Sequence, residues 1–443
     1  MDIKKEFNIE KMKKVFEDEN FYIDNMEDII SDEVIDISNN YKRSVNYVMN
    51  QFVDKYMVRG EKPIPDNIKF FVNSVLNSNN NRCFFTNINF YLKYMIKLRE
   101  VINISGINYN AFEFIKNKDN NKDLVSEIEV IATECEQNID KYPFAVNLVL
   151  GRIYDVLGLR TLATEKFSEA IKFNNNYLEF LLYEQPINSY ISNIQKGILP
   201  NNKIEFINLY NINKKITAII SVNEKYFRAY GTTLLNLFNI LEDIHLHINI
   251  IGEVEEIKPL INEAIEIYDS ICNLRKNNIS KPTFSVESIP KNIKDTKTYY
   301  ACSRYINAKY FMDVFNSDIC IVDADITFSN VPYEHFNQCS KYDVSLCMND
   351  NILITPGRKI LAGLAYFKNN DNGRVFLDLV KDYMLNNLLG DSKDLWVLDQ
   401  NALEYAVWYV ITNNLEINMA NSRKLSPKTP LSQNLFRVVL KKV

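Results

Sequence analysis

Residues 317–330, SDICIVDADITFSN, constrain the fold more than any other part of the sequence. The apolar run over residues 319–322 leads directly into Asp323, Ala324 and Asp325. A short continuous apolar run is typical of a strand that is buried on both faces. Because alternate residues of a strand point to the same side, we expect Asp323 and Asp325 to reach one point while Ala324 turns away.

Two carboxylates held this close repel each other unless a positive charge lies between them. Oxygen ligands at the carboxyl end of a strand suit Mg²⁺ or Mn²⁺, shared with the phosphates of a substrate. The carboxyl edge of a parallel sheet is also where such folds bind nucleotides. We therefore predict that Asp323 and Asp325 bind a divalent metal. The alternative is a solvated acidic turn, since a D-x-D arises by chance about once in a chain of this length.

From residue 214 onward, apolar strand-like runs alternate with amphipathic helical segments. The strand-like runs are residues 216–222, 245–252, 283–289, 319–322, 343–348, 360–368 and 415–420. The helical segments include residues 226–239, 299–315, 371–388 and 394–412. Alternation of this kind predicts a mainly parallel sheet flanked by helices with right-handed crossovers, and hence an α/β domain over residues 214–443.

The preceding part of the chain, residues 1–200, is predicted to be an all-α domain, because apolar residues recur there at three- and four-residue spacing. Within residues 144–177, small and large side chains alternate as in two packed helices: Leu150, Gly151, Tyr154, Gly158, Ala163, Phe167 and Ala170. This spacing resembles a tetratricopeptide repeat, with departures at Asn147 and Asn175. One repeat cannot bury its faces alone, so the earlier helices are expected to stack on it. We favour a packing role, with binding of a protein partner as the alternative.

Composition excludes several classes of protein. A net charge of -5 argues against a nucleic-acid partner. The sequence contains no run of 18 apolar residues, so we expect no transmembrane segment. The N-terminus lacks the apolar stretch of a signal peptide. The seven cysteines are dispersed, without a C-x-x-C pair. This pattern is typical of reduced thiols, and we expect a cytoplasmic protein.

The order of features over residues 214–430 resembles the GT-A glycosyltransferases, enzymes that transfer a sugar from a nucleotide-sugar donor. A first strand runs into SVNEKYFRAYGTTLLNLF, a helix with Arg304 precedes the D-x-D strand, and AGLAYFKN and LWVLDQNAL follow. The D-x-D and the W-x-x-D-Q are the most specific parts. The resemblance implies a Rossmann-like mixed sheet and metal-dependent transfer to a glycan or protein acceptor. The expected donor is a nucleoside-diphosphate sugar, with a UDP-sugar as the first choice.

The resemblance also implies roles for individual residues. Asp325 would be the direct ligand of Mn²⁺ or Mg²⁺, and Asp323 would share the metal or bind the ribose. Arg304 would contact the diphosphate or the donor sugar, unless it forms only an ion pair on the helix surface. Asp399 would act as a base if the reaction inverts configuration, or as a stabilising carboxylate if it retains it. Asp399 or Asp394 can alternatively be just the N-terminal acid of a helix.

The implied donor site comprises Ser221, Val222, Asn223, Tyr226, Arg304, Asp323, Ala324, Gly363 and Gln400. Tyr226 would stack on the base, unless it is ordinary helix core. A glycine at position 363 would let a sugar approach the backbone. Trp396 would form a sugar platform or pack in the core. Many metal-dependent members of this family have a C-terminal histidine as a further metal ligand, and none of the three histidines here lies at that place. Arg423 and Lys428 would close over phosphate or remain a solvated basic tail.

Two other functions remain open from the sequence. A nucleotidyltransferase would use a similar sheet and acidic pair, but it usually has a glycine-rich loop after the first strand, and SVNEKYFRAY has none. A binding scaffold would use the helical repeat and carry an inactive α/β domain. The intact acidic pair argues against the scaffold.

Overall fold

The computed structural model describes residues 83–106, 110–173, 185–198, 203–210, 213–238, 244–275, 281–324, 333–391, 395 and 397–425. Asp325, Asp394, Trp396 and Lys428 lie outside the described residues, as do residues 1–82 and Asn175. The chain divides into two compact units. Unit 1 comprises Met1–Ile107, Asp119–Asp155 and Glu165–Gln185, and unit 2 comprises Asn108–Lys118, Val156–Thr164 and Pro186–Val443.

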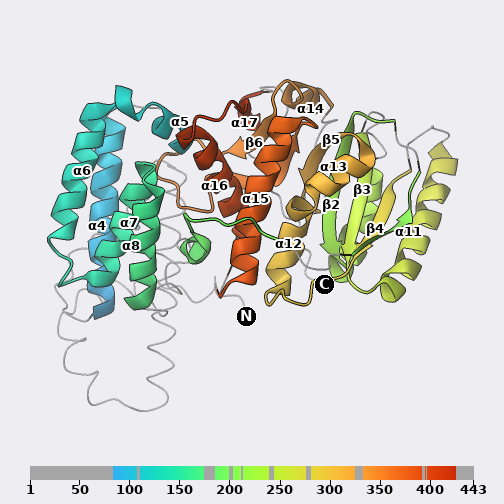
Figure 1. Cartoon of the computed structure of the whole chain (residues 1–443), viewed down its shortest axis with the longest axis horizontal. Coiled ribbons are helices and arrows are strands. Elements are labelled where there is room, and N and C mark those ends of the chain that lie inside the picture. Colours follow the sequence, from blue (N-terminus) through green and yellow to red (C-terminus); the bar gives the residue numbers. More distant parts are fainter. Residues whose placement is uncertain are drawn as a thin grey trace, which may run out of the picture. The chain divides into compact units, whose positions relative to one another are not determined.

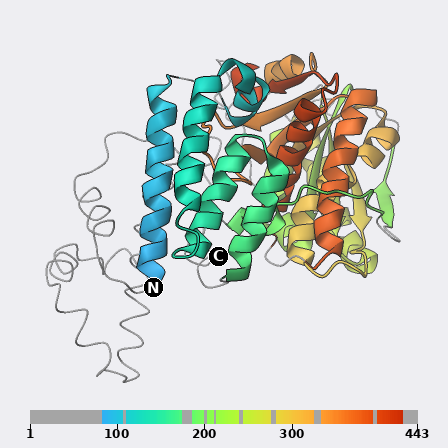
Figure 2. The same cartoon turned by 60° about the vertical axis from the view of Figure 1, so that its left-hand side comes forward.

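The described elements of unit 1 are helical, and α4 and α6 lie side by side in both views (Figures 1 and 2). The helices are α4 (Cys83–Ile104), α6 (Lys122–Glu136), α7 (Pro143–Val156) and α8 (Arg160–Phe173), of which Val156 and residues 160–164 belong to unit 2. Gly151 of α7 lies against Phe167 of α8, where an added Cβ would come within 2.4 Å of the ring. The helix pair expected in residues 144–177 is therefore present, whereas a tetratricopeptide repeat domain stays a prediction. No described helix has the length and apolar character needed to cross a membrane.

Unit 2 is built on an eight-stranded mixed sheet with the order β1-β4-β3-β2-β5-β7-β6-β8. Its strands are β1 (Ile204–Asn208), β2 (Ile216–Asn223), β3 (Ile244–Ile251), β4 (Thr283–Glu287), β5 (Asp318–Val322), β6 (Val344–Met348), β7 (Ile360–Phe367) and β8 (Met419–Asn421). The pairs among β2, β3, β4 and β5 are parallel, while β1 and β7 run antiparallel to their neighbours. The predicted α/β class is confirmed, with a mixed sheet in which β2, β3, β4 and β5 are parallel.

Helices cover both faces of this sheet, and α12 and α15 lie side by side on one of them (Figures 1 and 2). That face carries α12 (Thr296–Ile306), α13 (Ala308–Phe315), α15 (Asp371–Leu389) and α16 (Leu398–Thr412), and the other carries α10 (Glu224–Phe238), α11 (Val254–Arg275) and α14 (Tyr333–Cys339). Ile319 and Ile321 pack in the core between the sheet and the first of these helix layers. Cys320 and Val322 pack in the core between the sheet and the second layer. Burying each of the larger apolar side chains contributes roughly 1.5–3 kcal/mol. Burial on both faces explains the continuous apolar run of β5. The remaining short elements are α5 (Ala111–Lys116), η3 (Lys118–Asn120), η4 (Gln185–Ser189) and α17 (Ser422–Leu425).

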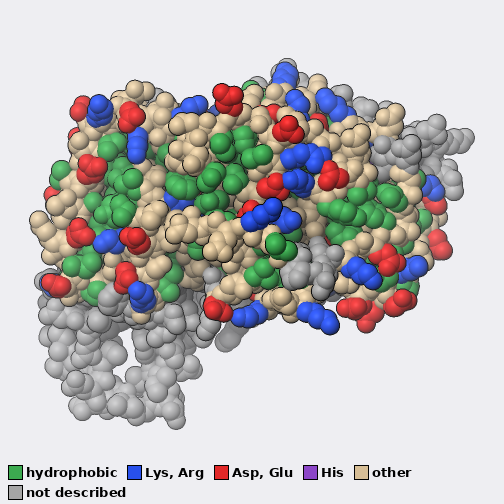
Figure 3. All heavy atoms as spheres, viewed as in Figure 1, with side chains coloured by type: hydrophobic (Ala, Val, Ile, Leu, Met, Phe, Trp, Pro, Cys, Tyr) green, Lys and Arg blue, Asp and Glu red, His purple; other side chains and the backbone are tan. Residues whose placement is uncertain are grey.

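A stripe of polar side chains crosses β3 and β4 beneath α12 and α13. It consists of His245, His247, Asn249, Thr283, Ser285 and Glu287, all fully buried. His247 shares hydrogen bonds with Thr283 (2.9 Å) and Ser285 (3.0 Å), and the Ser285 hydroxyl donates to Asn249 Oδ1 (2.8 Å). None of the chain's three histidines shows on the face drawn in Figure 3, in keeping with their burial. Burial lowers the pKa of His245 to about 3 and that of His335 to about 4, and it lowers the pKa of His247 well below 6.5.

Strand β7 contains an irregularity in its pairing with β6, beside the end of β5. Leu346 of β6 faces Ala365 of β7, but the next residue, Cys347, faces Leu361. The β7 residues 362–364 therefore form a bulge against β6. Within it, the Gly363 carbonyl accepts a hydrogen bond from the Asp323 backbone N–H (2.9 Å).

Candidate active site

The centre of the sheet contains a topological switch point. From β2 the chain proceeds to β3 and β4 on one side, and then returns to β5 on the other side of β2. Ile219 of β2 faces Ile321 of β5 in a parallel register, which places Ser221 level with Asp323 when it is extended by two residues. In open α/β sheets, ligands bind outside the carboxyl ends of the strands at such a point.

Three charged side chains from separate elements meet beside this point. Arg304 of α12 forms ion pairs with Asp323, just after β5, and with Asp399 of α16, the latter at 3.1 Å. Its Nη2 also donates to the carbonyl of Ala362 in the β7 bulge (3.5 Å), which accepts from the Tyr305 hydroxyl as well (2.5 Å). We call Arg304, Asp323, Asp399 and the Ala362 carbonyl the Arg304 cluster.

The Arg304 cluster is buried at one end and open at the other. The side chains of Arg304, Asp399 and Asp323 are 5%, 11% and 33% exposed, respectively. Burial alone would lower the pKa of Arg304, but Asp323, Tyr305 and Asp399 raise it, so the guanidinium stays charged. Burial raises the pKa of Asp399, while Arg304 opposes this rise. Asp323 is the most exposed member of the cluster, and Arg304 is not the surface ion pair considered from the sequence.

The start of α16 holds Asp399 in a constrained position. Val397, just before the helix, has a left-handed backbone with φ of 59°, which is unusual for a β-branched residue and costs about 1–3 kcal/mol. The Gln400 backbone N–H donates to Asp399 Oδ1 (2.9 Å). The Gln400 side-chain amide, oriented by its hydrogen-bond partners, donates to the carbonyls of Gly357 (2.6 Å) and Ile360 (3.1 Å). Gln400 thus anchors the loop between β6 and β7, residues 349–359, whose Ile352, Leu353 and Ile354 are buried.

The end of β2 and the first turn of α10 place four predicted donor residues in different environments. Ser221 is buried and accepts a long hydrogen bond from Asn249 (3.5 Å), and Val222 packs in the core beneath α10 and α11. Asn223 caps α10 by accepting from the Tyr226 N–H (2.9 Å). Tyr226 is 50% exposed, with its ring 5.8 Å from that of Tyr230. Tyr226 is therefore available to a ligand, and the helix-core alternative is wrong.

The predicted metal site is described in part. Asp323 gives one carboxylate oxygen to Arg304, which leaves the other for a cation, while Asp325 lies outside the described residues. Ala324 follows Asp323 and packs against the core beneath α10, α11 and α14. Within the described ranges, no group of three His, Cys, Asp or Glu side chains is arranged to hold a metal. A bound Mn²⁺ or Mg²⁺ would draw its other oxygen ligands from Asp325, water and the ligand's phosphates, which suits the preference of these ions for oxygen.

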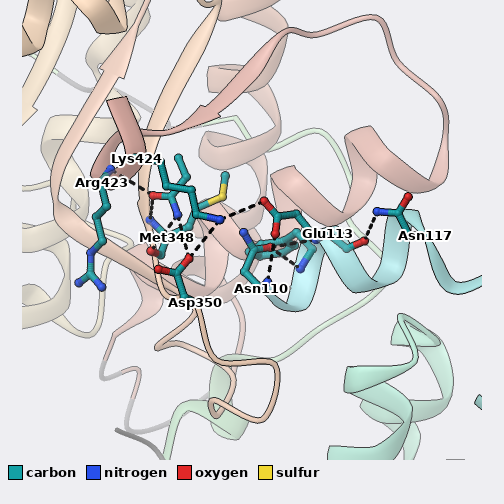
Figure 4. Close-up of polar contacts among 9 residues, drawn as sticks. Asn110, Glu113, Asn117, Met348, Asp350, Arg423 and Lys424 are labelled. Carbon is teal, nitrogen blue, oxygen red and sulfur yellow. Dashed lines mark hydrogen bonds and ion pairs between the residues drawn. The ribbon is translucent and has the colours of Figure 1, made fainter. Parts of the chain in front are cut away.

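The carboxyl ends of β6 and β8 lie along the same edge of the sheet, where Lys424 forms two ion pairs (Figure 4). Lys424 of α17 forms ion pairs with Glu113 of α5 (3.3 Å) and Asp350 after β6 (3.5 Å), and Arg423 points away from both. These exposed ion pairs add little stability. Arg423 Nε donates to Cys347 Sγ (3.1 Å), and the part of the chain that the structure describes offers Arg423 no carboxylate partner. The Arg423 guanidinium is thus left with capacity to bind an anion at this edge.

Sequence reasoning did not single out Tyr305 or the polar stripe. In HLHINIIG and TFSVE, polar residues recur at every second position, and this signal was visible in the sequence. Such alternation usually marks a strand with one solvated face, whereas here α12 and α13 cover that face. Burial of the stripe follows only from the packing.

Comparisons with known proteins give weak similarity. No family model and no curated protein matches the chain. Among solved structures, the apo-form glycosyltransferase GlyE from Streptococcus pneumoniae TIGR4 is similar, with 12% sequence identity and a TM-score of 0.29. The match covers 47% of this chain and 45% of the GlyE chain, so it spans less than half of that protein. A likeness at this level carries no argument for the function of this chain.

Proposed function

We propose that this protein is a glycosyltransferase that uses a nucleoside-diphosphate sugar, with a glycan or protein as acceptor. The observation that carries the proposal is the position of the Arg304 cluster at the switch point between β2 and β5. Nucleotides bind at such points, and the cluster places an acid and a fixed cation beside the open edge. The order of the D-x-D and W-x-x-D-Q segments along the chain supports the same reading.

In this proposal, Arg304 and Asp399 bind hydroxyl groups of the donor sugar. Arg304 holds one Asp399 oxygen and the Gln400 N–H holds the other, so the carboxylate is fixed before the ligand arrives. Fixed dipoles and charges lower a barrier without reorganisation during the reaction. Asp399 in this setting serves either as base or as stabilising carboxylate. Gly363, which is buried next to the carbonyl that Arg304 contacts, would let the sugar approach the backbone.

The departing diphosphate develops negative charge when the bond to the anomeric carbon breaks. A metal held by Asp325 and the free oxygen of Asp323 would neutralise that charge. Arg423, which lies at the same edge, is a further candidate to contact the diphosphate. Tyr226 and Asn223 would border the nucleotide.

The direct test is a screen for donor hydrolysis across nucleotide sugars with Mn²⁺ or Mg²⁺. The parent protein is expected to release nucleoside diphosphate from one donor class only when metal is present. Asp325→Asn should reduce this rate at least 100-fold, since removing one carboxylate weakens both metal binding and charge neutralisation. Asp391→Asn is the matched control, because the Asp391 side chain is fully exposed and should change nothing.

The same screen separates the alternatives. Formation of a nucleotide sugar from a sugar phosphate and a nucleoside triphosphate would assign the site to a nucleotidyltransferase. Neither turnover nor metal-dependent nucleotide binding would leave the binding scaffold as the remaining function.

Replacing Tyr226 by alanine tests the nucleotide-facing role of the first turn. The affinity for nucleoside diphosphate should fall about 10-fold or more, because stacking an aromatic ring on a base contributes about 1–3 kcal/mol. The free energy of unfolding should change by less than about 0.5 kcal/mol, since this side chain is half exposed. Calorimetric titration and urea unfolding measure the two quantities. Tyr310→Ala is the control, as Tyr310 is similarly exposed on α13; equal loss of affinity in both variants would contradict the assignment.

A further inference from the structure

A buried carboxylate lies next to the Arg304 cluster. Glu287, the last residue of β4, is fully buried and accepts four hydrogen bonds. Asn307 Nδ2 donates to Oε1 at 2.9 Å, and the Tyr299 hydroxyl donates to the same oxygen. Asn249 Nδ2 and the Ser303 hydroxyl donate to Oε2, each at 2.5 Å. Every lone-pair direction of the carboxylate thus has a donor.

Three of these donors form one stripe along α12 and its C-cap. Tyr299, Ser303 and Asn307 follow one another at four-residue spacing, which places them on the same face of the helix. One carboxylate therefore contacts two successive turns of α12. Burial and Glu287 raise the pKa of Tyr299, so its hydroxyl keeps the proton that it donates. Contacts with both turns fix the helix in rotation and in position along its axis.

Arg304 directly follows Ser303 on this helix. Successive residues of an α-helix are about 100° apart, so the face that contacts Glu287 determines the direction of the Arg304 side chain. That side chain must reach Asp323 and Asp399 together inside a closed site. A displacement of about 1 Å in such a site costs about 100-fold in rate. Burying a carboxylate to hold a helix carries a desolvation penalty that packing with apolar side chains would avoid. Its directional hydrogen bonds set a rotation that apolar packing would leave less defined.

We propose that Glu287 is a positioning residue, which fixes α12 so that Arg304 meets Asp323 and Asp399. This inference rests on the proposed function for its effect on donor binding, whereas its structural part stands independently. Asn249 extends the arrangement to β2, because its amide also lies 3.5 Å from the Ser221 hydroxyl. The carboxyl ends of β2, β3 and β4 are thereby linked to the helix that carries the arginine.

The first measurement is the affinity for a nucleotide sugar and for the matching nucleoside diphosphate. Glu287→Gln should weaken binding of the nucleotide sugar about 10-fold and leave that of the diphosphate within about 3-fold, since Arg304 faces the sugar. Tyr299→Phe removes one hydrogen bond to Glu287 and leaves every charge in place. It should weaken binding of the nucleotide sugar about 3-fold, with the same selectivity over the diphosphate. Glu205→Gln, on the exposed side of neighbouring β1, is the matched control and should leave both affinities unchanged. Equal weakening of both ligands in Glu287→Gln would overturn the proposal, because general loosening of the site affects both.

The second measurement does not depend on any ligand. Urea midpoints are determined for Glu287→Gln, Arg304→Gln and the double variant. If Glu287 positions Arg304, the double variant should lose less than the sum of the two single shifts, because the partner is already misplaced. Additive shifts would overturn the positioning role. If the parent binds no nucleotide sugar but the shifts are non-additive, the proposed function fails and the positioning role stands.

Discussion

Replacement of Arg304 by glutamine is expected to abolish donor hydrolysis and to lower the free energy of unfolding by about 3–5 kcal/mol. The Arg304 side chain is 5% exposed and compensates two carboxylates, of which Asp399 is 11% exposed. Removing the cation leaves Asp399 buried as an unpaired charge. Urea unfolding and the donor-hydrolysis assay measure the two effects.

Further variants separate the contribution of the charge from that of packing. Arg304→Gln combined with Asp399→Asn removes both charges and should recover much of the lost stability, but no activity. Arg374→Gln is the matched control, because Arg374 forms an exposed ion pair with Asp313 and should contribute less than about 1 kcal/mol. An Arg304→Gln variant as stable and active as the Arg374→Gln control would show that the cluster is neither a structural nor a functional centre.

Acidification from pH 7 to pH 5 is expected to destabilise unit 2 by about 4 kcal/mol through two histidines alone. The pKa values of His245 and His335 are about 3 and about 4 in the folded protein, against about 6.5 when unfolded. Between these values the unfolded chain binds a proton that the folded chain does not, so stability falls as the pH falls. Each histidine contributes about 2 kcal/mol at pH 5, and His247 acts in the same direction.

Urea unfolding of the parent and of His335→Phe at pH 7 and pH 5 tests this expectation. The variant should lose about 2 kcal/mol less on acidification, because one titrating group is gone. Phe336→Leu, on the same helix, is the matched control: it should lower stability at both pH values and keep the full pH dependence. A pH dependence unchanged in His335→Phe would mean that folding does not lower the pKa of this histidine.

The sequence predicted elements well where short-range pattern and packing agree. Strand β5 is covered on both faces, so its apolar run identified it, and the D-x-D located the edge of the sheet. Strand β1 was missed, because it is stabilised by antiparallel pairing with β4, about 80 residues away in the chain. Pairing over such a separation leaves no local pattern.

The candidate site was only partly predictable for the same reason. Arg304 and Asp399 are 95 residues apart in sequence, and their contact depends on how α12, β7 and α16 pack. The family resemblance assigned both residues to the site, but no spacing in the sequence predicts that they contact each other. Glu287 was not recognised, since a single acid at the end of a strand usually reaches solvent. Its burial depends on the donors supplied by α12, which the strand's own sequence does not reveal.

The loop between β6 and β7 has a consequence for the thermodynamics of ligand association. Its Ile352, Leu353 and Ile354 are buried, and Gln400 holds Gly357 and Ile360 by hydrogen bonds. The conformational entropy of this segment is therefore lost when the protein folds, not when a ligand arrives. A ligand that binds against this loop therefore contacts a preordered segment. Little of its binding free energy is lost to ordering that part of the protein.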